Sequence, residues 1–383
     1  MEPNLALVLL AGLAAAPTWG EAELSQEIHT YELRAHVYRL ASPEFQGRQG
    51  PGAARAARHI GDAFEALKLK PAFGGSYFQD VPSPTDPRGF IGTNVAAVLP
   101  GSDPKLRDEW VIFAAHHDHV GVKKGVLYPG ADDNASGVAA LLEVAEAFAL
   151  SPHKPRRTVV FISFDQEEAG LLGSKHFAEH PPLPLEKLRA VLVSDMLGRS
   201  MGDVMDEYVF ALGSEWSPRL RKLVTEVRPE DGLTVGRVGA DVIGTRSDYG
   251  PFRDRKVPFL FFSTGQHRDY HQPTDTPDRI DYAKLRRIAC WQRDLLARLA
   301  DDDEAPAWSE QAAAPDLDEA RTMLVLVRRV LKRVELYPLS AQQRDLLGGV
   351  EGKLAGIVER GKMSVQERGW LLAMAQLMLA SMF

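Results

Sequence analysis

Histidine and acidic side chains stand just past the ends of successive predicted strands. They are His116, Asp118, Glu167, Glu168 and Asp195, with Asp133 at the start of a predicted helix and His271 in a later loop. In an open α/β sheet this rim is where ligands bind, and sheet stability requires neither acids nor histidines there. Nitrogen and oxygen donors without a thiolate suit zinc. A divalent metal would also offset the repulsion among so many carboxylates.

Each of these residues has an ordinary structural explanation when it is taken alone. Asp133 can cap a helix N-terminus, and Glu167 and Glu168 can lie in an acidic first helical turn. Asp195 can form a turn after its strand, and His271 can be a surface loop residue. Only the whole set, in this order along the chain, indicates a metal site.

Short apolar runs alternate with helical patterns in the part of the chain that carries these residues. The predicted strands cover 94–99, 110–115, 158–164, 190–194 and 258–263. The predicted helices cover 27–40, 53–67, 135–150, 171–179, 218–227 and 282–299. This alternation predicts an α/β fold: a mixed, mainly parallel central sheet flanked by helices on both faces, with room for antiparallel edge strands.

The flanking segments differ in composition from this core. An apolar stretch at 5–16, followed by small residues, predicts a signal peptide over 1–20 and export to the periplasm or medium, although Glu2 stands where a basic residue is usual. The catalytic domain is expected over 21–300 and an acidic, Pro/Ala-rich linker over 301–315. Residues 316–383 predict a helical appendage, either docked on the catalytic domain or serving as a dimer contact or substrate lid.

Composition excludes several other classes of protein. The net charge of −7 over 383 residues argues against nucleic acid as a partner. The single cysteine, Cys290, excludes an internal disulfide framework and a thiolate zinc cluster. Beyond the predicted signal, no stretch is long and apolar enough to span a membrane.

The ordered motifs resemble those of the co-catalytic di-zinc exopeptidases, which include bacterial leucyl aminopeptidases and glutamate carboxypeptidase. The matching stretches are 115–121, 129–137, 167–174, 194–196, 247–248 and 270–271, with 40–48 similar to the lead-in of exported members. The resemblance runs from about residue 40 to 299 and leaves the appendage uncovered. It implies the zinc exopeptidase fold and release of N-terminal residues from peptides with a free N-terminus.

The resemblance also implies a role for each residue of the set. Asp133 would bridge two Zn2+ ions, with His116 and Asp195 completing one site and Glu168 and His271 the other. Glu167 would be the general base. Asp118 would hold the ring of His116 through a hydrogen bond. Tyr270 would donate a hydrogen bond to the oxyanion, and the Asp133–Asn134 peptide would be cis.

Two features depart from the family pattern. Tyr249 follows Ser247-Asp248 where many relatives have histidine, which bears on the substrate pocket and not on the metals. His117 and His119 are additional histidines, expected at the surface or behind the ligands and not as ligands themselves.

Three other functions remain open on this scaffold. Glutaminyl cyclisation in similar enzymes uses one zinc, whereas the full donor set here favours two. A carboxypeptidase acting on acidic residues needs a basic cluster, for which Arg199, Arg246 and Arg253 are the candidates. A non-catalytic binding module would be expected to have lost ligands, and none of the expected ligands is missing.

Overall fold

The computed structural model describes residues 27–86, 89–310, 315–333 and 335–382. The predicted signal peptide over 1–20 lies outside the described residues, as do residues 311–314 of the predicted linker. Among the described residues, no helix is both long enough and apolar enough to cross a membrane.

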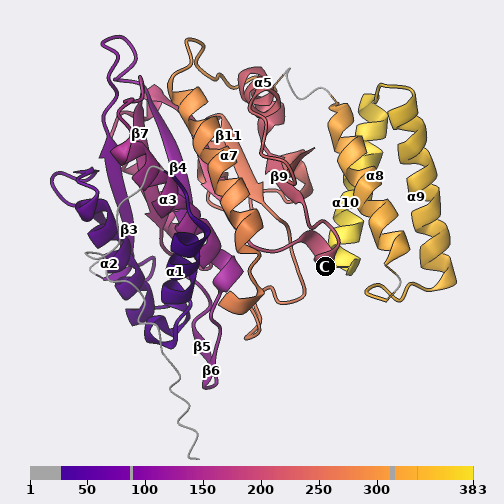
Figure 1. The fold of residues 1–383 in the computed structure, drawn as a ribbon, viewed down its shortest axis with the longest axis horizontal. Helices are drawn as coiled ribbons and strands as arrows, with labels where there is room; N and C mark the ends of the chain where they lie inside the picture. Colours follow the sequence, from indigo (N-terminus) through magenta and orange to yellow (C-terminus); the bar gives the residue numbers. More distant parts are fainter. Residues whose placement is uncertain (1–26, 87–88, 311–314, 334, 383) are drawn as a thin grey trace, which may run out of the picture.

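Nine strands of the described chain form one twisted central sheet (Figure 1). Their order is β1-β3-β7-β4-β8-β11-β9-β10, and β2 also pairs with β3. The strands are β1 (Lys70–Pro71), β2 (Phe78–Pro82), β3 (Phe90–Leu99), β4 (Trp110–His116), β7 (Thr158–Phe164), β8 (Leu188–Ser194), β9 (Tyr208–Leu212), β10 (Thr234–Val238) and β11 (Phe259–Ser263). Two further strands, β5 (Val122–Lys123) and β6 (Val126–Leu127), form a separate hairpin.

The centre of the sheet is parallel and its flanks are mixed. Strands β7, β4, β8 and β11 all run in the same direction. Antiparallel pairing joins β3 to β7 on one side and β9 to β11 on the other. This arrangement confirms the predicted mixed α/β sheet with antiparallel edge strands, and its parallel centre brings the carboxyl ends of the four central strands to one edge.

Helices cover both faces of the sheet because side chains alternate along each central strand. In β4, one set of alternate side chains packs with α1 (Thr30–Leu40), α2 (Pro51–Ala66), α3 (Gly137–Leu150), α5 (Pro218–Glu226) and α7 (Tyr282–Ala300). The other set packs in a second core with α4 (Leu172–Glu179), α6 (Gly250–Arg253) and the C-terminal helices. Both faces of β4 are fully buried, as its continuous apolar run predicts.

Strands β2, β9 and β10 were not predicted from the sequence. In β10, Gly236 and Arg237 interrupt the apolar pattern that marks a strand. A Cβ atom at Gly236 would lie 2.9 Å from Thr322 Cγ2 of α8 (Leu317–Lys332), so close packing against a helix far along the chain favours glycine at this position. Such long-range packing is not visible in the local pattern.

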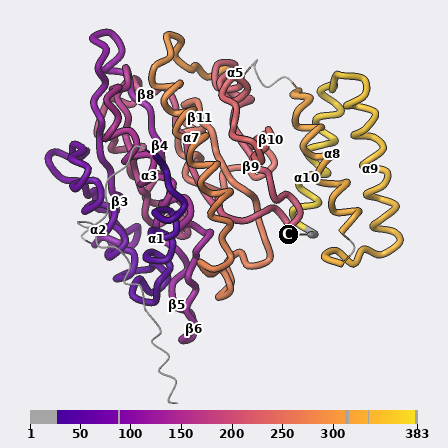
Figure 2. The backbone as a smooth tube through the Cα atoms, in the orientation of Figure 1, coloured from indigo at the N-terminus to yellow at the C-terminus, as the bar shows by residue number. Residues whose placement is uncertain are grey.

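The C-terminal appendage consists of α8 (Leu317–Lys332), α9 (Ala341–Glu359) and α10 (Val365–Met382), so it is helical as predicted. It lies beside the β9–β10 edge of the sheet (Figures 1 and 2). The Tyr337 hydroxyl donates to the Gly202 carbonyl at 2.6 Å, and Arg329 Nη1 donates to the Val204 carbonyl at 2.9 Å. Gln376 Nε2 donates to the Asp241 carbonyl at 3.1 Å. These contacts fit the docked alternative.

Candidate active site

The parallel strands deliver the predicted donors to one edge of the sheet. His116 is the last residue of β4, which lies between β7 and β8. The turn after β7 carries Glu167 and Glu168, and Asp195 directly follows β8. The remaining donors arrive from loops, Asp133 just before α3 and His271 after β11.

The structure gathers these side chains into two adjoining groups of possible metal ligands. One group contains His116, Glu167 and Asp195, and the other contains His119, Asp133, Glu168 and His271. Within each group the donor atoms lie within 4.8 Å of one another. The five residues expected to hold metal therefore lie together, with Glu167 and His119 beside them.

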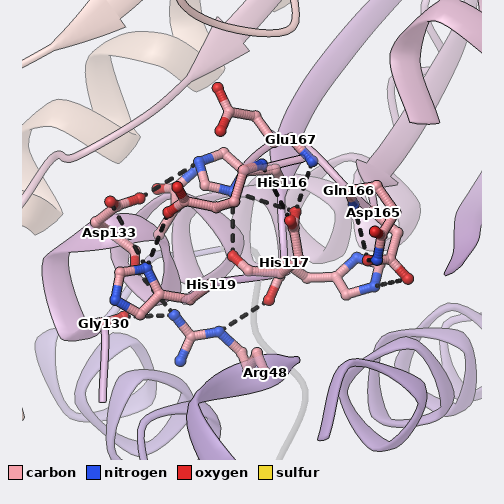
Figure 3. Close-up of polar contacts among 12 residues, drawn as sticks. Arg48, His116, His117, His119, Gly130, Asp133, Asp165, Gln166 and Glu167 are labelled. Carbon is pink, nitrogen blue, oxygen red and sulfur yellow. Dashed lines mark hydrogen bonds and ion pairs between the residues drawn. The ribbon is translucent and has the colours of Figure 1, made fainter. Parts of the chain in front are cut away.

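Asp133 lies between the groups and faces both of them. Its Oδ1 is 3.5 Å from His116 Nε2, and its Oδ2 is 3.0 Å from His271 Nε2 (Figure 3 shows Asp133 beside His116 and His119). A carboxylate placed in this way can supply one oxygen to each of two metal ions. The Asp133–Asn134 peptide is cis, as the resemblance implied.

The donor atoms have the spacing and orientation that a metal would need. His271 Nε2 is buried and makes no hydrogen bond, although it lies 3.0 Å from both Asp133 Oδ2 and Glu168 Oε1. His116 Nε2 is 3.3 Å from Asp195 Oδ1. Tetrahedral coordination with bonds of about 2.0–2.1 Å separates ligand atoms by roughly 3.3 Å. These residues therefore fit divalent metal ions.

Asp118 differs in detail from its expected role. The nearest acceptor to His116 Nδ1 is the backbone carbonyl of Asp118 at 3.2 Å, and the Asp118 carboxylate is 3.6 Å away. That carboxylate accepts hydrogen bonds from the backbone amides of Glu167 at 3.0 Å and Glu168 at 3.1 Å. Asp118 therefore connects the end of β4 to the turn that carries both glutamates.

The additional histidines are buried, which makes the surface alternative wrong for both. His119 Nδ1 lies 3.1 Å from Glu168 Oε1, within the second donor group. His117, the residue after β4, is outside both donor groups, and its Nδ1 lies 3.0 Å from Ser163 Oγ. A side chain that forms a hydrogen bond with a metal-binding carboxylate orients that carboxylate. His119 is therefore placed to orient Glu168, which its position in the sequence did not indicate.

Burial and mutual charge shift the acids of the cluster in different directions. Burial raises the pKa of Glu167 well above its usual range, with repulsion from Asp195 in the same direction and the charge of His116 opposing. Burial also raises the pKa of Asp133. Glu168 is different, because the close contacts of its carboxylate with His119 at 3.1 Å and His271 at 3.0 Å outweigh its burial and lower the pKa of Glu168. The adjacent glutamates are thus electrostatically distinct.

Tyr270 lies at the border of the donor cluster. Its ring stacks on His271 with the centroids 3.9 Å apart. Burial and the surrounding carboxylates, Asp133 first among them, raise the pKa of the Tyr270 hydroxyl. The hydroxyl therefore stays protonated at neutral pH and can donate a hydrogen bond.

Residues 94–296 of the chain match Peptidase family M28. This chain belongs to peptidase family M28. The match covers the whole donor set and ends before the C-terminal appendage begins.

The curated relatives align with only part of this chain, and this chain spans less than two thirds of their length. Aminopeptidase YwaD of Bacillus subtilis is 29% identical over 188 residues, which are 46% of this chain and 38% of that protein. A zinc aminopeptidase from Bacillus subtilis has a similar structure, with a TM-score of 0.56, 16% identity, and coverage of 74% of this chain and 98% of that one. A Porphyromonas gingivalis glutaminyl cyclase has a TM-score of 0.55, 16% identity and coverage of 72% and 99%. The fold is therefore shared by more than one activity.

Several residues around the M28 donor set were not assigned a role from the sequence. Ser247 Oγ donates to Asp195 Oδ2 at 3.0 Å and so orients that carboxylate. Asp275 accepts hydrogen bonds from the backbone amides of Asp132 at 3.0 Å and Asp133 at 3.1 Å. Ser247 lies in the matching stretch 247–248 and Asp275 lies four residues beyond His271, but their contacts join residues more than fifty positions apart in the sequence.

Arg48 makes more hydrogen bonds around the site than any other residue described in this section, and the sequence did not reveal this role. Its guanidinium is fully buried beneath the cluster (Figure 3) and donates to five backbone carbonyls. The acceptors are the carbonyls of Leu40, His117, Pro129, Gly130 and Asp133. Burial lowers the pKa of Arg48 to about 10, which still leaves it charged at neutral pH. Arg48 thus fixes the loop that presents Asp133.

Gly130 is required by the same loop. It has a φ of +58°, and a Cβ atom there would lie 2.2 Å from the Asp133 carbonyl oxygen. A side chain at this position would move the backbone that Arg48 holds.

We expect Arg48→Lys to lower both thermal stability and metal content. A lysine ammonium is a compact donor and cannot reach five carbonyls spread around a planar fork. Each buried acceptor left unsatisfied costs about 1–3 kcal/mol. Calorimetry should show a lower unfolding temperature, and elemental analysis should show less bound zinc per chain after dialysis.

Arg58→Lys is the matched control, because Arg58 is exposed on α2. It should behave like the wild type. Equal unfolding temperature and zinc content in Arg48→Lys and wild type would contradict the role assigned to Arg48.

Proposed function

We propose that this chain is a zinc-dependent aminopeptidase that removes N-terminal residues from peptides. The observation that carries the proposal is the position of Asp133, whose two oxygens face two separate sets of nitrogen and oxygen donors. Membership in peptidase family M28 and the aminopeptidases among its relatives support it.

Two Zn2+ ions fit the donor chemistry, which contains imidazole and carboxylate but no thiolate. His116 and Asp195 would hold one ion, Glu168 and His271 the other, and Asp133 both. When bound, such a pair polarises a carbonyl oxygen and makes a water molecule more acidic. His119 and Ser247 would orient Glu168 and Asp195, because each lies within hydrogen-bond distance of its carboxylate.

The remaining steps belong to side chains of the chain itself. Glu167 lies beside His116 and Asp195, on the side of the cluster opposite Arg48 (Figure 3). It would take a proton from the attacking water and pass it to the leaving nitrogen. Tyr270 would donate a hydrogen bond to the oxygen that gains negative charge as the carbonyl carbon becomes tetrahedral.

A carboxypeptidase that acts on acidic residues needs several arginine or lysine side chains free to bind the substrate carboxylates, and two of the three candidate arginines are paired within the chain. Arg199 pairs with Asp269 at 3.0 Å, and Arg253 pairs with Asp241 at 3.1 Å. Both guanidinium groups are therefore already engaged by carboxylates of the chain, and of the three candidate arginines only Arg246 is exposed, in the lining of a cavity that also contains Asp195. The complete donor set, His271 included, favours two metals and hydrolysis over single-zinc glutaminyl cyclisation or a non-catalytic binding role.

We also propose that the chain is exported. The apolar stretch over 5–16 supports a cleaved signal peptide, because Ala15, Ala16, Thr18 and Gly20 at and after its end supply the small residues of a cleavage site. The substrate would then be a peptide outside the cytoplasm.

The first test compares hydrolysis of leucine 4-nitroanilide by the zinc-loaded protein with hydrolysis of its N-acetylated twin. We expect cleavage of the free amine alone, because an aminopeptidase must recognise the N-terminus. Cleavage of both compounds at similar rates, or of neither, would contradict aminopeptidase activity. In the latter case cyclisation of N-terminal glutamine would be the next assay.

We expect Glu167→Gln to lower kcat by about 10²–10⁴-fold, the usual contribution of a general base. The amide keeps the shape of the side chain but cannot accept the proton. Zinc content and KM should stay near wild type, because Glu167 is assigned to proton transfer and not to metal binding. The measurements are steady-state kinetics on leucine 4-nitroanilide and elemental analysis.

Glu186→Gln is the control, because Glu186 is exposed and precedes the start of β8, whereas the donor Asp195 follows the end of β8. Near wild-type kcat in Glu167→Gln would refute the assigned base. Loss of zinc in this variant would instead make Glu167 a ligand.

A further inference from the structure

An apolar cavity of about 210 Å³ adjoins the donor cluster. Asp195 is one of the donors, Tyr270 stacks on the donor His271, and both residues also line this cavity. A substrate whose scissile carbonyl lies at the donors can therefore direct a neighbouring side chain into the cavity without leaving the site. This continuity assigns the cavity to the side chain of the residue that is removed.

The inner wall of the cavity comes from the sheet edge. Phe210 and Leu212 of β9 and Phe261 of β11 contribute side chains to it. Val238, the last residue of β10, adds a further apolar side chain. These residues lie within the stretch that matches family M28.

The opposite wall comes from the C-terminal appendage, outside the family match. Met323 and Leu326 of α8, and Ala375 and Met378 of α10, line the cavity and are each at most 6% exposed. Helices α8 and α10, both outside the match over residues 94–296, thus complete a pocket beside the donors.

The appendage is held in place by polar contacts on both of these helices. Arg368 of α10 pairs with the buried Glu319 of α8 at 3.0 Å. Arg368 also lies 3.5 Å from Asp241, in the loop that follows β10. A Cβ atom at Gly239 would lie 2.4 Å from the Arg368 guanidinium, so the loop and α10 are in close contact. The outer wall is therefore positioned by contacts between α10 and the loop that follows β10.

We propose that α8 and α10 form the outer wall of the substrate side-chain pocket, so that the appendage determines which N-terminal residues are accepted. The inference rests on the aminopeptidase function proposed above. The pocket selects uncharged, apolar side chains. Four methionines, Met196, Met201, Met323 and Met378, line it, and their flexible side chains let it adapt to apolar groups of different shape. Arg246, exposed at the lining, repels a lysine or arginine side chain.

The decisive variant is Ala375→Leu, which adds bulk to the outer wall. The ratio of kcat/KM for leucine 4-nitroanilide to that for alanine 4-nitroanilide should fall at least about tenfold, since one misplaced methylene in such a pocket changes selectivity by about 10–200-fold. Ala373→Leu places the same change on an exposed position of α10 and should leave the ratio unchanged. An unchanged ratio in a folded Ala375→Leu protein overturns the proposal.

A second variant and a second readout cover the other outcomes. If Ala375→Leu unfolds, Met378→Ala is the alternative, because it shortens a side chain of the same wall and so enlarges the pocket. This variant should raise the ratio of kcat/KM for phenylalanine 4-nitroanilide to that for alanine 4-nitroanilide. An unchanged ratio overturns the proposal. Calorimetric binding of free L-leucine tests the pocket without turnover. If the wild type cleaves no anilide, weaker L-leucine binding by Ala375→Leu supports the pocket while the proposed activity fails. No L-leucine binding by an inactive wild type overturns both.

Discussion

The metal-binding arrangement depends on one short stretch of backbone, residues 130–134, being held from two sides. Arg48 donates to the carbonyls of Gly130 and Asp133, and Asp275 accepts from the amide of Asp133. These opposed, charge-assisted contacts place the Asp133 carboxylate between the donors of two strands and two loops. Without them, the carboxylates at the sheet edge would face a loop with no fixed position, and a bridging geometry would not be prepared in advance.

The parallel sheet explains why so much of this site could be predicted. Central strands buried on both faces appear in the sequence as continuous apolar runs, so the ends of β4, β7 and β8 are well defined. Polar residues just beyond those ends then stand out, and parallel strands bring them to one edge. The resemblance in motif order supplied the roles, including the pairing of Glu167 with Glu168.

The residues that were missed act over long distances. Arg48 is an arginine in a glycine-rich loop, and nothing in its neighbourhood shows that five carbonyls from three segments surround it. The pocket wall is hidden for the same reason. Helices α8 and α10 could be predicted from their composition, but the surface they cover is set by Gly236, Gly239 and other contacts on the sheet edge. Local sequence patterns predict where helices and strands lie, whereas the way a helix packs on the sheet depends on residues of both elements.

The most direct test of a bridging Asp133 is anomalous diffraction at the zinc edge from crystals of the zinc-loaded protein. The account predicts two peaks about 3.5–4 Å apart, the usual separation in co-catalytic sites. One should lie beside His116 and Asp195, the other beside Glu168 and His271, with one Asp133 oxygen directed to each. A single peak, or two peaks with Asp133 bound to only one of them, would contradict it.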